Sequence, residues 1–407
     1  HQQEQSMILR TASATRSIRA LLALLLGISL IAGTASNPTS ASAASVAKPG
    51  ATCSKKGATQ TIKSIKYTCV KSGKKLVWNK GVRVRATTKP PVLVPDTSSQ
   101  PLSFDNLDTK RVRQAAFAEV TKVVQSMPAV NPNVTVIAGP SLTAERVDAE
   151  RAGLKRTASF WADLFLPKTA YIGYYTEADL AWVDSAFCQQ AAFCPVGEWG
   201  PVSKMIQRDL PWCSSAQATN NQRGEPFFNQ CLGKGSDYVK NKQTTPHEYT
   251  HWVQASLGQM DTYPNWWIEG GAAYFGGALG VWNGATVPST LDEVVHSDSR
   301  GWAEQDLCPL STPTVEKIAD CFRYTYKRGA PPSPDSKWMI AHVSYYMGAL
   351  ATEAMVAVKG MDTYKTFMND LRTKDFDNAI QANFGLTADE FYAKVSKYVL
   401  AMYLEGR

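Results

Sequence analysis

Five consecutive residues near the middle of the chain have the types and spacing of a metal-dependent hydrolytic centre: His247-Glu248-Tyr249-Thr250-His251. On an α-helix, residues i and i+4 share a face, so the imidazoles of His247 and His251 can reach one zinc ion. Zinc lowers the pKa of a bound water and polarises a carbonyl, while a neighbouring carboxylate takes the proton and passes it to the leaving amine. The run therefore predicts His247 and His251 as metal ligands and Glu248 as the general base.

The same run also admits a purely structural interpretation. Thr245 and Glu248 have the spacing of a capping box, in which the glutamate serves the helix backbone rather than water. Such a cap explains neither histidine. The helix is otherwise well marked, because Thr244 or Thr245 can cap it, Pro246 suits its first turn and Gly258 suits the position after its end.

A catalytic zinc site needs a third protein ligand and an open position. Glu269 follows His251 by 18 positions and lies in the run Asn265–Phe275, NWWIEGGAAYF. A helix–turn–helix return of this length can bring a second helix across the first, and Gly270 and Gly271 flatten the surface for close approach. Glu269 is the predicted third ligand, and the alternative is a solvated helix residue.

Together, HEYTH and the downstream WWIEGGAAYF resemble the gluzincin branch of zinc metallopeptidases, the peptidase-MA-like group that includes thermolysin and aminopeptidase N. The resemblance covers residues 130–405. It implies Zn²⁺ held by His247, His251 and Glu269, Glu248 as general base, and a peptide or protein substrate. The Gly-x-Met-Glu-Asn motif of dedicated aminopeptidases is not seen upstream, which disfavours that activity.

A tyrosine later in the chain completes the resemblance. Residues 341–350, AHVSYYMGAL, are similar to the helix that in aminopeptidase-like gluzincins carries a tyrosine shortly before a Gly-Ala pair. The similarity implies that Tyr345 donates a hydrogen bond to the oxyanion, a role that accounts for about 3 kcal/mol of barrier. Tyr346 and His342 are alternatives. Ordinary packing of aromatic residues at helical spacing explains the same pattern.

The remaining sequence must position these residues. Hydrophobic periodicity predicts a helix over Leu107–Gln125, a strand over Val134–Ala138, a helix over Leu142–Leu166 that starts at Ser141 or is capped by Thr143, a strand over Thr169–Tyr175, a loop-rich segment over 188–236, and helices from Thr245 onward. We therefore expect an α+β fold. It would contain a zincin-like catalytic domain with a small mixed sheet and an active-site helix, followed by a mainly helical C-terminal subdomain.

Composition divides the chain into segments. Three arginines, the apolar run 20–33 and a small-residue stretch have the layout of a secretory signal peptide, with Met7 the expected start. The expected segments are 1–43 (upstream residues and signal peptide), 44–86 (basic β module), 87–103 (Pro/Thr/Ser-rich linker), 104–245 (N-terminal part of the zincin domain) and 246–407 (active-site helix and helical C-terminal subdomain). The β module resembles short repeats of exported actinobacterial proteins.

The net charge of +8 is unevenly distributed. Residues 48–90 hold 12 Lys or Arg and no Asp or Glu, whereas the chain after them is net acidic. The positive charge can therefore indicate a binding partner only for residues 48–90. The expected partner of this segment is an anionic cell-wall polymer. The alternative is a merely solubilising extension. We expect no nucleic-acid partner and no stable membrane span after signal removal.

The eight cysteines fit an exported protein, because an even number without a C-x-x-C pair is typical of a disulfide framework. Short loops favour pairing of neighbours in the sequence: Cys53–Cys69, Cys188–Cys194, Cys213–Cys231 and Cys308–Cys321. With the cysteines oxidised and no Gly-x-Ser-x-Gly elbow, a nucleophilic mechanism is not supported.

These features predict a secreted, extracellular and wall-associated zinc-dependent peptide hydrolase of the metalloendopeptidase kind. The alternative is a cell-wall-binding or adhesive protein that keeps a zincin scaffold without turnover. A third possibility is hydrolysis of an amide in another polymer, such as wall peptide.

Overall fold

The computed structural model contains two compact units, one of which comprises Pro101–Arg407. The described residues are 48–62, 65–83, 100–195, 200–208, 213, 216–233, 243–258, 260–280, 313–324 and 336–405, with no side-chain description at 61, 82–83, 324 and 336–343. The predicted signal peptide and most of the predicted linker lie outside these residues.

The basic segment folds into a small antiparallel sheet. Its strands are β1 (Thr59–Ile62), β2 (Ile65–Ser72), β3 (Lys75–Trp78) and β4 (Val82–Arg83). β2 is central and pairs with each of the other three. The predicted Cys53–Cys69 disulfide is present, and Cys69 and Trp78 are the buried side chains of this module.

The larger unit contains a second sheet of four strands. These are β5 (Val134–Ala138), β6 (Ala170–Tyr175), β8 (Pro226–Cys231) and β7 (Ala216–Asn220), in that spatial order. β5, β6 and β8 are parallel, and β7 runs antiparallel to β8. The predicted mixed sheet and its first two strands are confirmed. The loop-rich prediction for 188–236 is wrong at β7 and β8.

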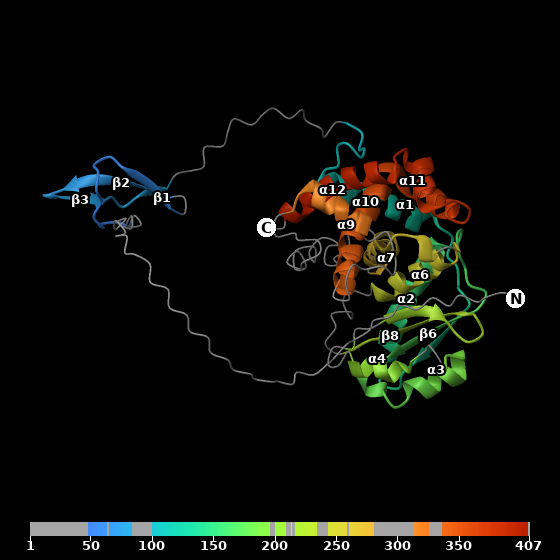
Figure 1. The fold of residues 1–407 in the computed structure, drawn as a ribbon. Helices are drawn as coiled ribbons and strands as arrows, with labels where there is room; N and C mark the ends of the chain where they lie inside the picture. Colours follow the sequence, from blue (N-terminus) through green and yellow to red (C-terminus); the bar gives the residue numbers. More distant parts are fainter. Residues whose placement is uncertain are drawn as a thin grey trace, which may run out of the picture. The chain divides into compact units, whose positions relative to one another are not determined.

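Helices cover both faces of this sheet (Figure 1). α3 (Val183–Ala191) and α4 (Val202–Arg208) lie on one face, and α2 (Ala144–Phe160) and α6 (Thr244–Ala255) lie on the other. The alternation of strand side chains explains this arrangement, because Ile172 and Tyr174 point to the α6 side whereas Tyr175 points to the α3 side. Thr143 caps α2, as one of the two sequence alternatives predicts.

Most of the other described residues of this unit are helical, and from Thr244 onward this agrees with the sequence prediction. Its helices are α1 (Thr109–Ser126), α7 (Asn265–Gly280), α9 (Val315–Tyr324), α10 (Ser336–Asp370), α11 (Phe376–Phe384) and α12 (Ala388–Glu405), with short 3₁₀ turns at Glu177–Asp179 and Met260–Thr262. In Figure 1, α7 lies between α6 and the layer that contains α10 and α12. None of the described helices is long and apolar enough to cross a membrane.

Two further disulfides tie down loops in this unit. Cys188–Cys194 and Cys213–Cys231 form as the sequence predicts, and Cys321 is also disulfide-bonded. Its predicted partner at position 308 lies outside the described residues. Disulfides persist in oxidising environments, so these bonds suit an extracellular or similarly oxidising location.

α7 approaches α10 so closely that two glycines form the contact. A β-carbon added at Gly270 would lie 2.2 Å from the carbonyl carbon of Gly348, and one added at Gly348 would lie 1.9 Å from the carbonyl oxygen of Trp266. No real contact is that short, so the backbones themselves would have to separate. The two glycines therefore set the distance between the helices.

Two arginines hold the far ends of the helices that carry the predicted ligands. Arg372 donates to the carbonyl of Ser256, which caps α6, and Arg156 donates to the carbonyls of Leu279 and Gly280 at the end of α7. Carbonyls in a last helical turn lack partners within the helix and carry partial negative charge. The arginines satisfy them and so fix the position of both helix ends.

The glycine contact gives the first prediction. Gly348→Ala should lower the free energy of unfolding by about 2 kcal/mol or more, because overpacking against a backbone cannot be relieved by side-chain rotation. Gly153→Ala is the control, since its β-carbon would meet Pro246 at an ordinary 3.7 Å. The control should be neutral or stabilising by up to about 1 kcal/mol, because alanine favours helix. Urea denaturation measures both, and equal effects of the two substitutions would contradict the assignment.

Candidate metal centre

α6 carries the two predicted histidine ligands and is buried from its first turn. The helix begins at Thr244 without a side-chain cap, so the prediction that Thr244 or Thr245 caps it is wrong. The hydroxyl of Thr245 instead donates to the buried carboxylate of Glu150 at 2.7 Å and lies 2.9 Å from the hydroxyl of Tyr174. A negative charge beside a helix N-terminus is favourable, so Glu150 stabilises the start of α6 without a cap.

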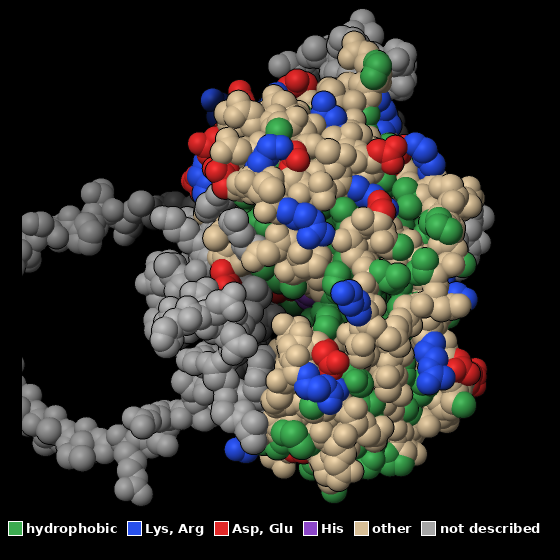
Figure 2. Space-filling model, turned by 90° about the vertical axis from the view of Figure 1, so that its right-hand side faces the viewer, with side chains coloured by type: hydrophobic (Ala, Val, Ile, Leu, Met, Phe, Trp, Pro, Cys, Tyr) green, Lys and Arg blue, Asp and Glu red, His purple; other side chains and the backbone are tan. Residues whose placement is uncertain are grey.

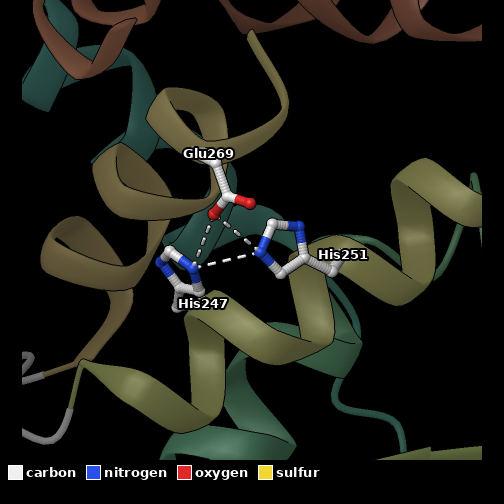
Figure 3. A group of neighbouring side chains, drawn as sticks. All are labelled: His247, His251 and Glu269. Carbon is white, nitrogen blue, oxygen red and sulfur yellow. Dashed lines mark hydrogen bonds and ion pairs between the residues drawn. The ribbon is translucent and has the colours of Figure 1, made fainter. Parts of the chain in front are cut away.

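Three ligand atoms converge between α6 and α7 (Figure 3). The Nε2 atoms of His247 and His251 lie 3.1 Å apart. Oε2 of Glu269 lies 3.3 Å from Nε2 of His251 and 3.7 Å from Nε2 of His247. All three side chains are buried, and their ligand atoms lie within 4.8 Å of one another. The structure therefore brings together the three residues predicted as ligands in a group that could hold a metal ion.

The state of the Glu269 carboxylate supports a cation at this point. Its Oε2 atom is buried and faces both imidazoles, yet it makes no well-directed hydrogen bond to any described group. Buried polar atoms are normally satisfied by a partner. A metal ion coordinated by Oε2 and the two Nε2 atoms would supply that partner, so the residues present fit the group.

The same convergence shifts the protonation of two ligands. Burial opposes charge on both His251 and Glu269, but their mutual electrostatic attraction at 3.3 Å outweighs it. The pKa of His251 rises to about 9, and the pKa of Glu269 falls well below its ordinary value. Without a metal, a proton on His251 compensates the Glu269 charge, and a bound cation would displace that proton.

Glu248 lies beside this group on the same helix and is also buried. Burial raises the pKa of its carboxyl group, although the two histidines and a backbone hydrogen bond from Ala218 oppose the shift. Ala218 belongs to β7, so the edge of the sheet contacts Glu248 directly. A buried carboxylate with a raised pKa holds a proton more readily than an exposed one.

The predicted tyrosine also reaches the group. The ring of Tyr345, on α10, stacks on the imidazole of His247 with centroids 5.6 Å apart and an angle of 13° between the planes. Adjacent residues on a helix point about 100° apart, so Tyr346 is directed to another side. The side chain of His342 is outside the described set. Tyr345 is thus the tyrosine that the structure places against a predicted ligand.

Although buried, the group can be reached from outside. Figure 2 shows a hollow near the middle of one face, with a histidine side chain visible inside it and hydrophobic side chains around it. The exposed fractions of His247, His251 and Glu269 are 7%, 5% and 7%. A small part of the group is therefore exposed within this hollow.

The sequence did not indicate three residues that contact this site or the start of the helix that carries it: Glu150, Ala218 and Gln254. Glu150 and Ala218 come from elements distant in the sequence, so no local pattern reveals them. Gln254 lies three residues after His251 on α6, and its Oε1 atom is 2.9 Å from Nδ1 of His251. The i, i+3 spacing was a usable signal for that contact.

Comparison with known proteins adds no assignment. No protein-family model matches the chain, and the search of curated proteins found no match. The interpretation of the site therefore depends on its chemistry and geometry, and the resemblance to gluzincins stays a prediction.

Proposed function

We propose that the Pro101–Arg407 unit is a zinc-dependent peptide hydrolase of the gluzincin type. The observation that carries the proposal is the convergence of His247, His251 and Glu269 beside a buried Glu248. Two imidazole nitrogens and one carboxylate oxygen are ligands that zinc favours in catalytic sites, where three protein ligands leave a further position open. When bound, zinc would supply a Lewis acid that activates water and polarises a carbonyl.

The role of Glu248 follows from its surroundings. The carboxylate is on the same helix as both imidazoles, and the N–H of Ala218 donates to it, which fixes its direction. Burial raises its pKa, so the group can take a proton from the attacking water and hold it until the leaving nitrogen accepts it. Tyr345, stacked on His247, can donate its hydroxyl proton in a hydrogen bond to negative charge that develops on the substrate oxygen.

The position of β7 favours an extended peptide as substrate. β7 is the edge of the four described strands of this sheet. Asn221 donates to the carbonyl of Glu225 at 2.9 Å at the hairpin end, and this register directs the amide of Ala218 away from β8. That outward amide lies against Glu248. An extended chain that pairs with a sheet edge here would place its backbone amides beside the general base.

The alternative, a binding scaffold without turnover, explains fewer of the observed features. A binding scaffold has no use for a buried carboxylate with a raised pKa next to two imidazoles, because burying a charged group costs free energy. The complete set of proton acceptor and metal ligands favours hydrolysis over binding alone.

Glu248→Gln tests the catalytic assignment. The amide keeps the size of the side chain but cannot accept the proton, so hydrolysis of a mixed peptide library should fall by roughly 10²- to 10⁴-fold. Metal analysis of the same preparation should still find about one zinc per chain, because the three ligands are intact. His251→Ala should lose both metal and activity. Equal cleavage by wild type and Glu248→Gln would contradict the proposal and favour the scaffold without turnover.

Tyr345→Phe tests the oxyanion contact. Removal of the hydroxyl should lower kcat roughly 10- to 10³-fold with little change in KM, because the hydrogen bond forms as charge develops. Tyr346→Phe, the adjacent residue on the same helix, is the matched control and should retain activity. If Tyr346→Phe showed the larger loss, the roles of the two tyrosines would be exchanged.

We further propose that the β module binds an anionic cell-wall polymer. Eight lysines of the described part of the module are exposed: Lys48, Lys55, Lys56, Lys66, Lys71, Lys74, Lys75 and Lys80. Its Trp78 is buried, which removes a stacking surface for nucleic-acid bases, and Val70 is its exposed large hydrophobic residue. The surface therefore suits attraction to a polyanion more than base stacking or membrane insertion.

The turn between β2 and β3 provides a test of this second proposal. Replacing Lys71, Lys74 and Lys75 by Gln in the full chain should weaken retention on isolated bacterial cell walls and reduce its dependence on NaCl concentration. The same three positions changed to Arg keep the charge and should retain binding. Unchanged retention of the Gln variant would show that the lysines only aid solubility.

A further inference from the structure

Gln254 makes three contacts that link the second histidine to the helix of the third ligand. The side chain is 1% exposed and projects from α6. Its Oε1 atom lies 2.9 Å from Nδ1 of His251. Its Nε2 atom donates to the carbonyls of Trp267 at 3.1 Å and Ile268 at 2.9 Å, in the first turn of α7. Glu269 is the next residue along that helix.

These contacts determine the direction of the amide. The carbonyls of Trp267 and Ile268 can only accept hydrogen bonds, so the group facing them must be the NH₂ of Gln254. The amide oxygen then faces His251, and Nδ1 of His251 must carry the hydrogen that it accepts. In the neutral imidazole, the lone pair is left on Nε2, the atom that faces Glu269 and His247.

The surface of α7 is open to Gln254 because of a glycine. A β-carbon added at Gly271 would lie 3.3 Å from Nε2 of Gln254, which is tighter than most contacts of this kind. Because residue 271 is glycine and has no side chain, the amide of Gln254 reaches the carbonyls of Trp267 and Ile268. These two residues directly precede Glu269 in α7. Gln254 thereby sets the distance between the second and third ligands as well as the tautomer of the second.

We propose that Gln254 is a positioning residue for the metal centre, a role that rests on the proposed function. Only a side chain with one acceptor and two donor hydrogens at this reach satisfies all three contacts. A glutamate lacks the donors, an asparagine is shorter by one methylene, and a methionine lacks both kinds of group. Outer-shell partners of this kind orient metal ligands and alter affinity and reactivity.

Gln254→Met tests the role, with metal binding as the readout. The substitution keeps volume but removes all three hydrogen bonds. Zinc affinity, measured by competition with a chelator, should fall roughly 10- to 100-fold. The visible absorption bands of the Co²⁺-loaded protein should also shift, because the ligands no longer hold one orientation. Both measurements are independent of peptide cleavage.

Gln230→Met is the matched control. Gln230 is equally buried at 1% exposed, and its Oε1 atom lies 3.1 Å from the hydroxyl of Thr245 in the first turn of α6. This variant should lose stability but keep the zinc affinity and Co²⁺ spectrum of the wild type. Wild-type affinity in Gln254→Met, or an equal loss in both variants, would overturn the role of Gln254. A wild type that binds no metal would instead contradict the metal centre itself.

Discussion

The close approach of α7 to its two neighbouring helices is the constraint on which the site depends. Gly270 meets Gly348 of α10 on one side, and Gly271 admits the amide of Gln254 from α6 on another. Glu269 directly precedes Gly270 and Gly271 in the sequence. The absence of side chains at these two glycines lets α7 lie close to its neighbours, which brings the Glu269 carboxylate near the two imidazoles. The same contact holds α10, and with it Tyr345, against His247.

Burial of charged side chains costs free energy, and in this site neighbouring charged groups offset that cost. His251 and Glu269 are buried together, and each offsets the charge of the other. The start of α6 is balanced by Glu150 through Thr245. Unpaired charges would be costly in this interior, so a cation that replaced the His251 proton would enter a site already shaped for positive charge. The negative charge of Glu269 thus explains both the raised pKa of His251 and the capacity of the group to hold a cation.

Much of this could be predicted from the sequence where periodicity or spacing is local. The ligand group, β5, β6 and the cap of α2 at Thr143 follow from short patterns. β7 and β8 were missed because the only apolar residues of AQATN are two small alanines and PFFNQC begins with proline, so their pairing is set by neighbouring elements rather than by propensity. The cap of α6 was wrong because the group that takes the Thr245 hydrogen bond lies 95 residues upstream.

The ligands and the groups that would tune them differ in how far apart they lie in the chain. His247, His251, Gln254 and Glu269 belong to one helix–turn–helix segment, so binding of a metal ion to this group would depend mainly on the packing of α6 with α7. Ala218 comes from the edge of the sheet and Tyr345 from α10, far away in the sequence on either side. In the proposed mechanism, proton acceptance and charge stabilisation would therefore depend on long-range packing that metal binding would not need. A chain could keep the metal group while losing turnover if β7 or α10 shifted, which is why the presence of metal and the presence of hydrolysis are separate physical questions for this fold.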